Sequence, residues 1–368
     1  MKPRASQPRQ KPSPAREVPT GERALIAAIR DRALRPRSVS KGVVRTGIGD
    51  DAAVLRPPAG EEIVVTTDFS LEQVHFRRDW HTSEVVGHRC LARGLSDLAA
   101  MGARPLAAFL SLAVPAELTA EEQGGSWVSR FFDGLLALAD RHNVPLAGGD
   151  TARSPEFDQR GTKHPGLVAA DIVLLGSVKR GHALLRSSAR LGDVIYVTGK
   201  LGGAAAELLA AGRNPERFAT LIVAGKDHPH LYPEPRVEVG LKLASAGKAH
   251  AAIDLSDGLS IDLLHVCEES ELAAELDAAA IPIHPLASQA EADGWVPSAL
   301  ALALHGGEDY ELLFTAPRWS RIPRKIAGVD IHPIGQMQPR RARHPRVVLR
   351  GRDGRSTSLE PGGWEHFS

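Results

Sequence analysis

Aspartate residues stand repeatedly at the ends of apolar runs in this sequence, beside glycine, serine or threonine. Because strand ends and helix starts gather along one rim of a sheet, we expect such carboxylates to meet in space. Two unit charges ~4 Å apart repel by about 4 kcal/mol at an effective dielectric constant of ~20, so a fold that gathers several of them needs a cation. The sequence therefore predicts a divalent-cation site built from Asp50, Asp51, Asp68, Asp97, Asp150, Asp254 and Asp257.

The ligand atoms in these segments are all oxygens, from carboxylates, hydroxyls and the backbone. Such a set selects Mg²⁺, Mn²⁺ or Ca²⁺ over zinc or copper. The two cysteines, Cys90 and Cys267, are too few for a zinc cluster, and we expect both to be small buried side chains. Mg²⁺ held by few carboxylates often shares the phosphates of its substrate, which favours a phosphate-bearing ligand.

Each aspartate taken singly also has a plain structural interpretation. Asp50 and Asp51 suit a turn, and Asp97 can pair with Arg93 one helical turn earlier. Asp257 can cap the helix that follows it. These alternatives stay open for each position, and the cation site depends on the repetition of the pattern.

Two glycine-rich segments form a second feature. Gly148-Gly149 and Gly199-Lys200-Leu201-Gly202-Gly203 each follow an apolar run. Turns of this kind let backbone N–H groups approach a phosphate, although more often they are purely structural. The Walker and dinucleotide-binding fingerprints and the protein-kinase signatures are absent from the sequence, so a nucleotide site here is of another type.

The apolar periodicity mixes helices and strands without strict βαβ order, which favours an α+β fold. A chain of 368 residues has room for about two domains, and we expect a disordered Pro- and Arg-rich tail over 1–20, an N-terminal domain over 21–180 and a C-terminal domain over 181–368. Residues 156–165 are polar and are expected to form an exposed loop. Helices are predicted at 22–34, 82–101, 121–142, 202–211 and 258–269, and strands at 63–67, 109–114, 144–147, 167–178, 193–198, 251–253 and 310–314.

The composition excludes several classes of protein. Hydrophobic residues make up 43% of the chain, which is enough for a core and excludes wholesale disorder. The net charge of +1 argues against a general nucleic-acid binder. No apolar run reaches the ~18 residues of a membrane helix. We therefore expect neither a nucleic acid nor a membrane as partner.

Six longer motifs contain these residues in a distinctive order. They are Gly47-Ile-Gly-Asp-Asp-Ala52, Thr66-Thr-Asp68 with His75-Phe76 after it, Leu95-Ser-Asp-Leu-Ala-Ala-Met-Gly-Ala103, Gly148-Gly-Asp-Thr151, Ala252-Ile-Asp-Leu-Ser-Asp-Gly258 and Gly306-Gly-Glu-Asp-Tyr-Glu-Leu312. In this order they resemble the thiamine-monophosphate kinase family, part of the aminoimidazole-ribonucleotide-synthetase-like superfamily. The resemblance covers about residues 22–368.

The resemblance implies a two-domain α+β (PurM-like) fold, with an N-terminal domain that forms a homodimer interface and a C-terminal α/β domain. It also implies a cytoplasmic enzyme that transfers a phosphoryl group directly from ATP to thiamine monophosphate with the help of several Mg²⁺ ions. The product is thiamine diphosphate, in the last step of its biosynthesis. A phosphate monoester has its second pKa near ~6, so the acceptor is mostly dianionic at neutral pH and needs no general base.

The resemblance also assigns roles to single residues. Asp68, Asp150 and Asp257 are the implied catalytic group. Arg186, His75, Glu308 and Trp364 keep plainer alternatives, as a solvated arginine, a wall residue, a strand start and a packing residue. The implied metal ligands are Asp51, Thr66, Thr67, Asp68, Asp97, Asp150, Asp254 and Asp257; the implied ATP contacts are Gly149, Asp150, Arg186 and Ser256; the implied substrate contacts are His75, Glu308 and Trp364.

Two other interpretations of function stay open. The first is another enzyme of the superfamily, but residues 1–50 lack the cysteine expected of a selenophosphate synthetase, and the C-terminus lacks the cysteine expected of the hydrogenase-maturation relative. The second is a non-catalytic sensor of nucleotide or thiamine phosphate. A sensor would be expected to lose metal ligands, whereas every motif aspartate is present.

Overall fold

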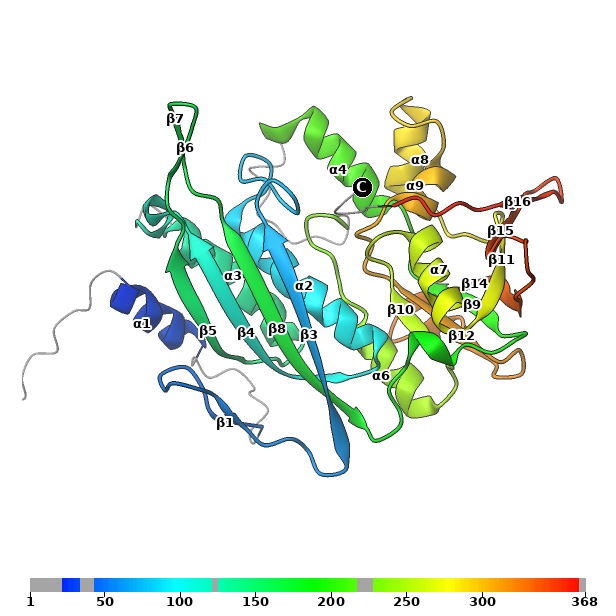
Figure 1. Cartoon of the computed structure of the whole chain (residues 1–368), viewed down its shortest axis with the longest axis horizontal. Coiled ribbons are helices and arrows are strands. Elements are labelled where there is room, and N and C mark those ends of the chain that lie inside the picture. Colours follow the sequence, from blue (N-terminus) through cyan, green and yellow to red (C-terminus); the bar gives the residue numbers. More distant parts are fainter. Residues whose placement is uncertain (1–21, 34–42, 121–124, 217–227, 364–368) are drawn as a thin grey trace, which may run out of the picture.

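The computed structural model describes residues 22–33, 43–120, 125–216 and 228–363. The tail expected over residues 1–20 lies outside these ranges, as does Trp364. The described chain forms two main β-sheets with helices packed against each of them (Figure 1). This arrangement confirms the predicted α+β class.

The N-terminal sheet has four strands in the order β3–β8–β4–β5. The β8 strand is antiparallel to both β3 and β4, and β5 is parallel to β4. The β8 strand nearly coincides with the predicted run 167–178, whereas β3, β4 and β5 are longer than the runs predicted for them. Their bounds are β3 Glu61–Leu71, β4 Arg104–Val114, β5 Leu146–Arg153 and β8 Ala169–Lys179.

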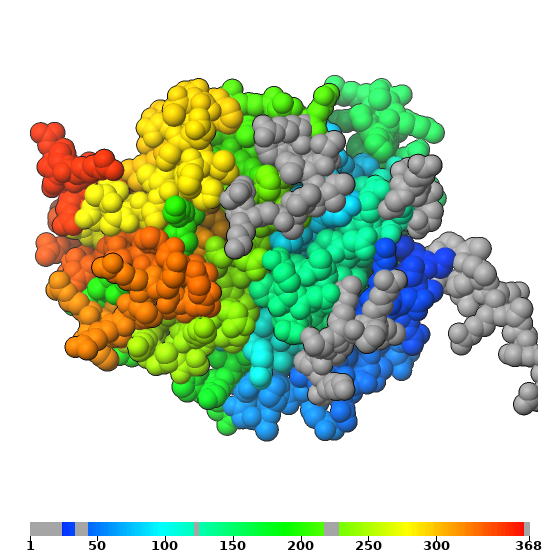
Figure 2. Space-filling view, turned by 180° about the vertical axis from the view of Figure 1, so that it is seen from behind, coloured from blue at the N-terminus to red at the C-terminus, as the bar shows by residue number. Residues whose placement is uncertain are grey.

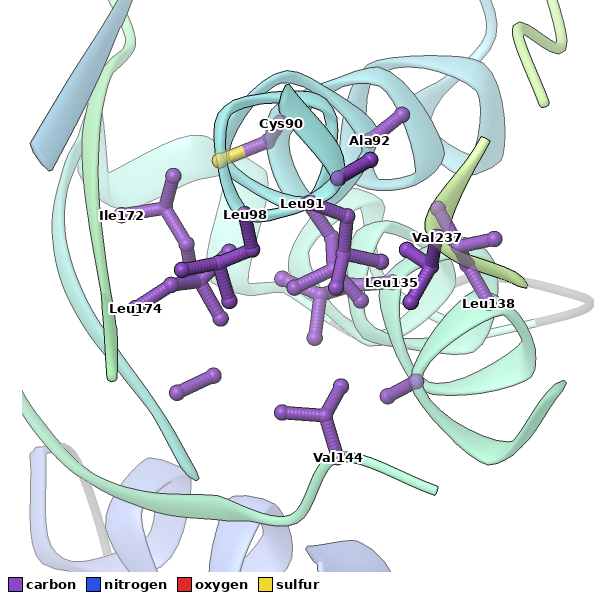
Figure 3. Close-up of a cluster of buried hydrophobic side chains, with 14 of the residues drawn as sticks. Cys90, Leu91, Ala92, Leu98, Leu135, Leu138, Val144, Ile172, Leu174 and Val237 are labelled. Atoms are coloured by element: carbon purple, nitrogen blue, oxygen red, sulfur yellow. The ribbon is translucent and has the colours of Figure 1, made fainter. Parts of the chain in front are cut away.

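Two long helices, α2 (Ser83–Ala100) and α3 (Trp127–Arg141), pack together against one face of this sheet. The side chain of Thr82 caps α2 by accepting a hydrogen bond from the Val85 amide. Glycine allows the helices to approach each other, since a Cβ on Gly134 would lie 1.9 Å from the carbonyl oxygen of Glu84. Figure 3 shows the core that results, which includes Cys90, Leu91, Leu98, Leu135, Leu138, Ile172 and Leu174.

The opposite face of the N-terminal sheet faces the viewer in Figure 1, and no described helix lies over its middle. Ile63, Val65 and Phe69 project from β3 on this side and are 42%, 60% and 51% exposed. Three large exposed apolar side chains on one face of a strand, with Thr67 between Val65 and Phe69, form a surface that favours a protein contact.

The C-terminal sheet has the order β10–β12–β9–β14–β11–β15–β16, and β13 pairs with β14. Most of its strands are short and partly polar, and β11 and β13–β16 were not among the predicted elements. The bounds are β9 Val194–Thr198, β10 Ala252–Asp254, β11 Leu272–Asp277, β12 Leu312–Ala316, β13 Lys325–Ile326, β14 Val329–Pro339, β15 Val347–Arg350 and β16 Ser356–Ser358.

Five described helices belong to this half of the chain. Helix α6 packs on α2 so closely that a Cβ on Gly240 would lie 2.0 Å from the carbonyl oxygen of Ala99. The view from behind in Figure 2 shows the two halves in broad contact, with the orange and yellow C-terminal residues on the left and the blue and cyan N-terminal residues on the right. The bounds are α4 Gly203–Arg213, α6 Val237–Ala246, α7 Leu259–Glu269, α8 Pro285–Ala292 and α9 Ala299–His305.

Two sequence predictions are wrong in detail. Residues 156–165 contain an antiparallel hairpin, β6 (Phe157–Gln159) and β7 (Thr162–His164), closed by the stacking of Phe157 on His164 with ring centroids 5.1 Å apart. Gly148-Gly149-Asp150 lies within β5, where a turn was expected, because the chain stays paired with β4 as far as Arg153. The remaining elements are α1 Glu22–Ala33, β1 Val44–Thr46, β2 Val54–Leu55 and the short 3₁₀ helices η1 Ala116–Thr119 and η2 Arg186–Ser188.

No helix in the described part of the chain is both long enough and apolar enough to cross a membrane.

Candidate active site

A cavity of about 980 Å³ lies where segments from both halves of the chain meet. Its walls come from β3, α2, the segment 73–81, α4, the loop after β10 and the segment 306–310. Seven predicted site residues line it, so most of the motifs do converge in space. They are Asp68, His75, Asp97, Asp254, Ser256, Asp257 and Glu308.

A second cavity, of about 490 Å³, adjoins the first. Asp97 and Asp254 line both cavities and therefore stand between them. Thr66 and Arg186, two further predicted site residues, line only the smaller one. Its wall also includes His265, which the sequence analysis did not select.

Asp97, which is partly buried, and Asp254, which is buried, form a pair of like charges. Asp97 projects from α2 and accepts a hydrogen bond from the Thr66 hydroxyl, and Asp254 ends β10 and accepts one from Ser96 Oγ at 2.8 Å. Burial, together with the charge of Asp97, raises the pKa of Asp254 to about 7, and burial raises the pKa of Asp97 as well. Such a pair is stabilised when a cation neutralises it.

Asp68 is held by an arginine. Arg93 of α2 donates from Nε (2.9 Å) and contacts from Nη2 (2.8 Å) the Oδ1 atom of Asp68 on β3. The alternative that Arg93 pairs with Asp97 is therefore wrong, because the guanidinium turns toward β3. The ion pair fixes one carboxylate oxygen, Oδ1, and within the described residues Arg93 makes no such contact with Oδ2 of Asp68.

The loop after β10 places Ser256 and Asp257 in the large cavity. The alternative role of Asp257 as a helix cap is wrong, since α7 begins after Gly258 without a side-chain cap. Instead, Oδ2 of Asp262 accepts hydrogen bonds from the amides of Ser256 (3.1 Å), Asp257 (3.2 Å) and Gly258 (3.0 Å). Asp262 thus holds the loop in which Asp257 lines the cavity.

The motif at 306–311 directs four consecutive polar side chains to different places. Glu308 and Tyr310 line the large cavity, and both have positive φ angles (56° and 48°), which is uncommon for residues other than glycine and often marks a functional site. Between them, Asp309 accepts hydrogen bonds from the amides of Gly202 (2.8 Å) and Ala204 (3.3 Å). Glu311 pairs with Arg236 and anchors α6 to the C-terminal sheet.

The glycine turn at 199–203 is therefore not a phosphate cradle. Its amides at Gly202 and Ala204 already donate to Asp309, so they are not available to a ligand. Burial raises the pKa of Asp309 to about 7. This turn has the structural role that the sequence analysis had kept open.

Asp51, Gly149 and Asp150 lie elsewhere, around a third cavity of about 590 Å³ beside β5. Asp150 pairs in register with the exposed Ser111, whereas Asp68 lies in the row of the buried Ile172 and Leu110. Facing residues in register share one side of a sheet, so Asp68 and Asp150 project from opposite faces. Within one chain, the predicted set of site residues is therefore divided into two groups.

The Thr67 side chain lies on the same face of the sheet as Asp150, opposite to that of Asp68. It neighbours Thr66 on β3, but its hydroxyl donates to Asp171 Oδ1 at 2.7 Å on the helix-free side of the sheet. Thr66 and Thr67 thus serve different faces, as successive residues of a strand must.

Several site residues were missed by the sequence analysis. Arg89 and Arg93 project from α2 at a four-residue spacing among small and apolar residues, and Arg89 contacts Glu308 Oε1 at 2.7 Å. Arg89 and His230 are 3% and 1% exposed. An arginine on the apolar stripe of a helix was the available signal, because a buried charge needs a partner.

The oxygen donors around Asp97 suit Mg²⁺ or a similar hard cation. Thr66, Asp68, Asp97 and Asp254 offer only oxygens, and the neighbouring carboxylates of Asp97 and Asp254 carry charge that an ion would balance. In the described part of the chain, no three carboxylate, imidazole or thiol groups are arranged to hold one ion by themselves. This fits a cation that keeps several waters or shares ligand phosphates.

Family profiles and individual proteins were found to be similar to this chain. Residues 49–173 match the profile described as AIR synthase related protein, N-terminal domain, and residues 190–319 match the corresponding C-terminal domain. A thiamine-monophosphate kinase from Bacillus subtilis (strain 168) is 32% identical, covering 91% of this chain and 97% of its own length. One from Salmonella typhimurium (strain LT2) is 37% identical, covering 95% and 98%.

Solved structures of thiamine-monophosphate kinases and of a protein with the same fold are also similar to this chain. The crystal structure of thiamine-monophosphate kinase from Stenotrophomonas maltophilia K279a has a TM-score of 0.73 and 37% identity, covering 90% of this chain and 96% of that one. AaThiL complexed with AMPPCP and TMP has a TM-score of 0.68 and 27% identity, covering 94% and 97%. The hydrogenase maturation protein HypE in complex with ATP shares the fold, at a TM-score of 0.70 and 18% identity over 93% and 96%.

Proposed function

Since this chain belongs to the thiamine-monophosphate kinase family, we propose that it transfers a phosphoryl group from ATP to thiamine monophosphate and so forms thiamine diphosphate. The observation that carries this proposal is the position of Asp97 and Asp254 between two adjoining cavities. A donor and an acceptor that enter from the two sides would meet at these carboxylates.

The larger cavity is assigned to thiamine monophosphate. Its volume of about 980 Å³ and its mixed wall, with His75 and Glu308 beside apolar residues of α4, suit a heterocyclic cation. The phosphates of ATP are assigned to Arg186 in the smaller cavity and to Ser256 beside Asp254. Trp364 stays a predicted substrate contact.

The chain's own residues position the reactants and need not remove a proton. The acceptor phosphate is mostly dianionic at neutral pH, so the attacking oxygen carries no proton to be abstracted. Asp68 is oriented by Arg93, and the charge of Arg186 acts on Asp97 and Asp254 across the smaller cavity. Mg²⁺ ions held by Thr66, Asp68, Asp97, Asp254 and Asp257 would neutralise the two polyanions and align them for in-line transfer.

We propose a homodimer, in which the predicted site residues that lie away from the large cavity of their own chain reach the site of the partner chain. Thr67, Asp51, Gly149 and Asp150 belong to the β5 edge and the helix-free face of the N-terminal sheet, where Ile63, Val65 and Phe69 are exposed. A second copy packed on this face would cover the apolar residues. It would also place its own Asp51 and Asp150, as further metal and ATP ligands, near the partner's sheet edge.

We assign the N-terminal domain to residues 21–180 and the C-terminal domain to residues 181–368. The four-stranded sheet with α2 and α3 lies in the first range, and the larger sheet lies in the second. Helix α6 belongs to the second range but packs on α2, so the two domains are in firm contact.

The test is direct product formation. Purified protein with ATP, Mg²⁺ and thiamine monophosphate is expected to yield thiamine diphosphate and ADP in equal amounts, as measured by chromatography. Asp68→Asn and Asp254→Asn are expected to lower kcat by at least about 100-fold while both variants remain folded, as checked by a cooperative thermal transition. Absence of thiamine diphosphate with the folded wild-type protein would refute the proposal.

A further inference from the structure

Glu308 lines the large cavity and contacts a buried network of polar side chains behind the cavity wall. Its Oε1 atom lies 2.7 Å from Nη2 of Arg89, and its Oε2 atom lies 3.1 Å from Nδ1 of His230. On the far side of that imidazole, His230 Nε2 lies 2.9 Å from His81 Nε2. Arg89, His230 and His81 are only 3%, 1% and 2% exposed, so water has little access to the network.

The direction of each hydrogen bond follows from the carboxylate. Burial opposes ionisation, but Arg89 and His230 hold the pKa of Glu308 well below its usual range, so both of its oxygens can only accept. We assign the hydrogen of His230 to Nδ1, which then faces Oε2 of Glu308 at 3.1 Å. Burial lowers the pKa of His230, which keeps the ring neutral with a single N–H, so its Nε2 accepts.

The same reasoning extends to His81. With His230 in this tautomer, His81 Nε2 carries the hydrogen that points to His230 Nε2, and His81 Nδ1 accepts from the Arg77 amide at 3.2 Å. The opposite direction, in which His81 Nδ1 donates to the Arg77 carbonyl oxygen at 3.0 Å, would turn a lone pair of His230 toward Glu308. Arg89 Nη1 donates to the carbonyl oxygen of His230 and also lies 3.1 Å from His230 Nδ1.

This network joins three walls of the cavity. Arg77 and His81 belong to the segment that also carries His75, and Glu308 belongs to the 306–310 segment. The backbone of His230 is tied to α4, because its amide donates to Glu207 Oε2 at 2.8 Å. Helix α4 contributes the apolar side chains of the same cavity. A shift of any one wall would therefore be transmitted to the Glu308 carboxylate.

We propose that His230 and His81 are positioning residues of the reaction, which fix the Glu308 carboxylate so that it receives the positively charged heterocycle of the acceptor substrate. The inference deepens the proposed function and depends on it. Each carboxylate oxygen has two lone pairs, so both can accept a further contact from the substrate while Arg89 and His230 hold them. An oriented carboxylate in a site of low dielectric attracts a cation more strongly than one in water.

The test uses paired substitutions of His81. His81→Leu removes the donor to His230 and is expected to raise the Kd for thiamine monophosphate, measured by calorimetry, about tenfold. The Kd for a non-hydrolysable ATP analogue is expected to stay unchanged. His81→Gln can still present an N–H at the same reach and is expected to stay within about threefold of the wild type. His88→Gln is the matched control, because His88 is also buried but bonds to the carbonyl oxygen of Pro233 at 2.8 Å.

A double-mutant cycle separates positioning from general destabilisation. In a Glu308→Gln background, His81→Leu is expected to change the Kd for thiamine monophosphate less than about twofold, since the carboxylate that it positions is gone. An equal effect in both backgrounds, or an equal loss of affinity for the ATP analogue, would overturn the proposal. If His81→Leu does not fold, His81→Met, which also lacks a donor to His230, takes its place in both backgrounds under the same criterion.

The outcome for the wild type distinguishes the two proposals. Wild-type protein that neither binds nor phosphorylates thiamine monophosphate overturns the proposed function and this inference together. Wild-type protein that does both, with His81→Leu indistinguishable from it in affinity, overturns only the positioning role.

Discussion

Asp68 and Asp150 lie on opposite faces of the same four-stranded sheet, three strands apart. The register runs from Asp68 through Ile172 and Leu110 to Gly149, the neighbour of Asp150. With strands spaced about 4.8 Å apart, the two positions are about 14 Å apart across the sheet, and their side chains point away from each other. One cation cannot bridge them within a single chain, so a shared role for them requires a second copy.

Mixed dimers test whether the site is shared. A dimer of one Asp68→Asn subunit and one Asp150→Asn subunit keeps one intact pair if each site draws Asp68 and Asp150 from different subunits. We expect such a dimer, purified through two different tags, to have about half of the wild-type kcat. Each parent homodimer is expected to be inactive.

A matched dimer supplies the control for this experiment. Asp68 and Asp254 line the same cavity of one chain, so a mixed dimer of Asp68→Asn and Asp254→Asn is expected to stay at background activity. Background activity in the Asp68→Asn and Asp150→Asn dimer as well would argue that the site lies within one chain.

The Asp97–Asp254 pair is expected to cost stability in the absence of ligands. Asp254→Asn keeps an oxygen that can accept from Ser96 Oγ but removes one of the two like charges. At pH 8 without divalent cations, we expect this variant to melt ~2–4 °C above the wild type, as measured by calorimetry, and to be catalytically inactive. Mg²⁺ with an ATP analogue should raise the melting temperature of the wild type more than that of the variant. A lower melting temperature for the variant in EDTA would contradict the repulsion.

Much of this site could be predicted because the aspartates end elements with clear periodicity. Helices α2 and α7 have regular apolar stripes, and Asp68, Asp97, Asp254 and Asp257 do meet at one cavity. The partners of these residues could not be predicted. Pairs such as Arg93 with Asp68 join different elements, and no local spacing records which way a side chain turns.

Other misses have a similar cause. Asp309, distant in the chain, accepts hydrogen bonds from amides of the 199–203 turn, which had suggested phosphate binding. Asp262, downstream in the chain, accepts those from the loop before α7, where Asp257 had suggested a helix cap. The strands β11 and β14–β16 are short or carry polar residues at many positions, and pairing with neighbours is what makes them strands. Asp150 was placed with the other aspartates by motif order, which carries no information on the face of a sheet.

The contact between α2 and α3 is expected to depend on glycine. In Gly134→Ala the new methyl group would lie 1.9 Å from the carbonyl oxygen of Glu84, so the helices must separate. We expect the free energy of unfolding to fall by about 3 kcal/mol in urea titrations. Ala137→Ser, an exposed position on the same helix, is expected to change it by less than about 0.5 kcal/mol. Equal effects of the two substitutions would show that the close approach is not required.

Buried histidines are expected to make the protein sensitive to acid. Burial lowers the pKa of His88 to about 4, so between pH 6.5 and 4 the unfolded chain binds a proton that the folded chain does not. The contribution of His88 to stability is therefore complete above pH 6.5 and is lost as the pH falls toward 4, by at most roughly 3 kcal/mol. Urea titrations at pH 7 and pH 5 should show a smaller decrease for His88→Gln than for the wild type. His344→Gln, in an exposed loop, should follow the wild type, and an identical pH dependence in all three proteins would refute this source of acid sensitivity.

Substitution of Arg186 is expected to change the KM for ATP but not the KM for thiamine monophosphate. Its side chain lines the smaller cavity only, and its charge acts on Asp97 and Asp254, where the ATP phosphates are assigned. Arg186→Met should raise the KM for ATP about tenfold, since a charged contact to phosphate is lost, and should leave the KM for thiamine monophosphate within about twofold. Arg190→Met, an exposed arginine four residues later that lines neither cavity, is the matched control and should change neither constant. Steady-state kinetics with each substrate varied in turn measure the two KM values separately. A parallel rise in both KM values would mean that Arg186 supports the fold around the two cavities. The assignment of ATP to the smaller cavity would then be wrong.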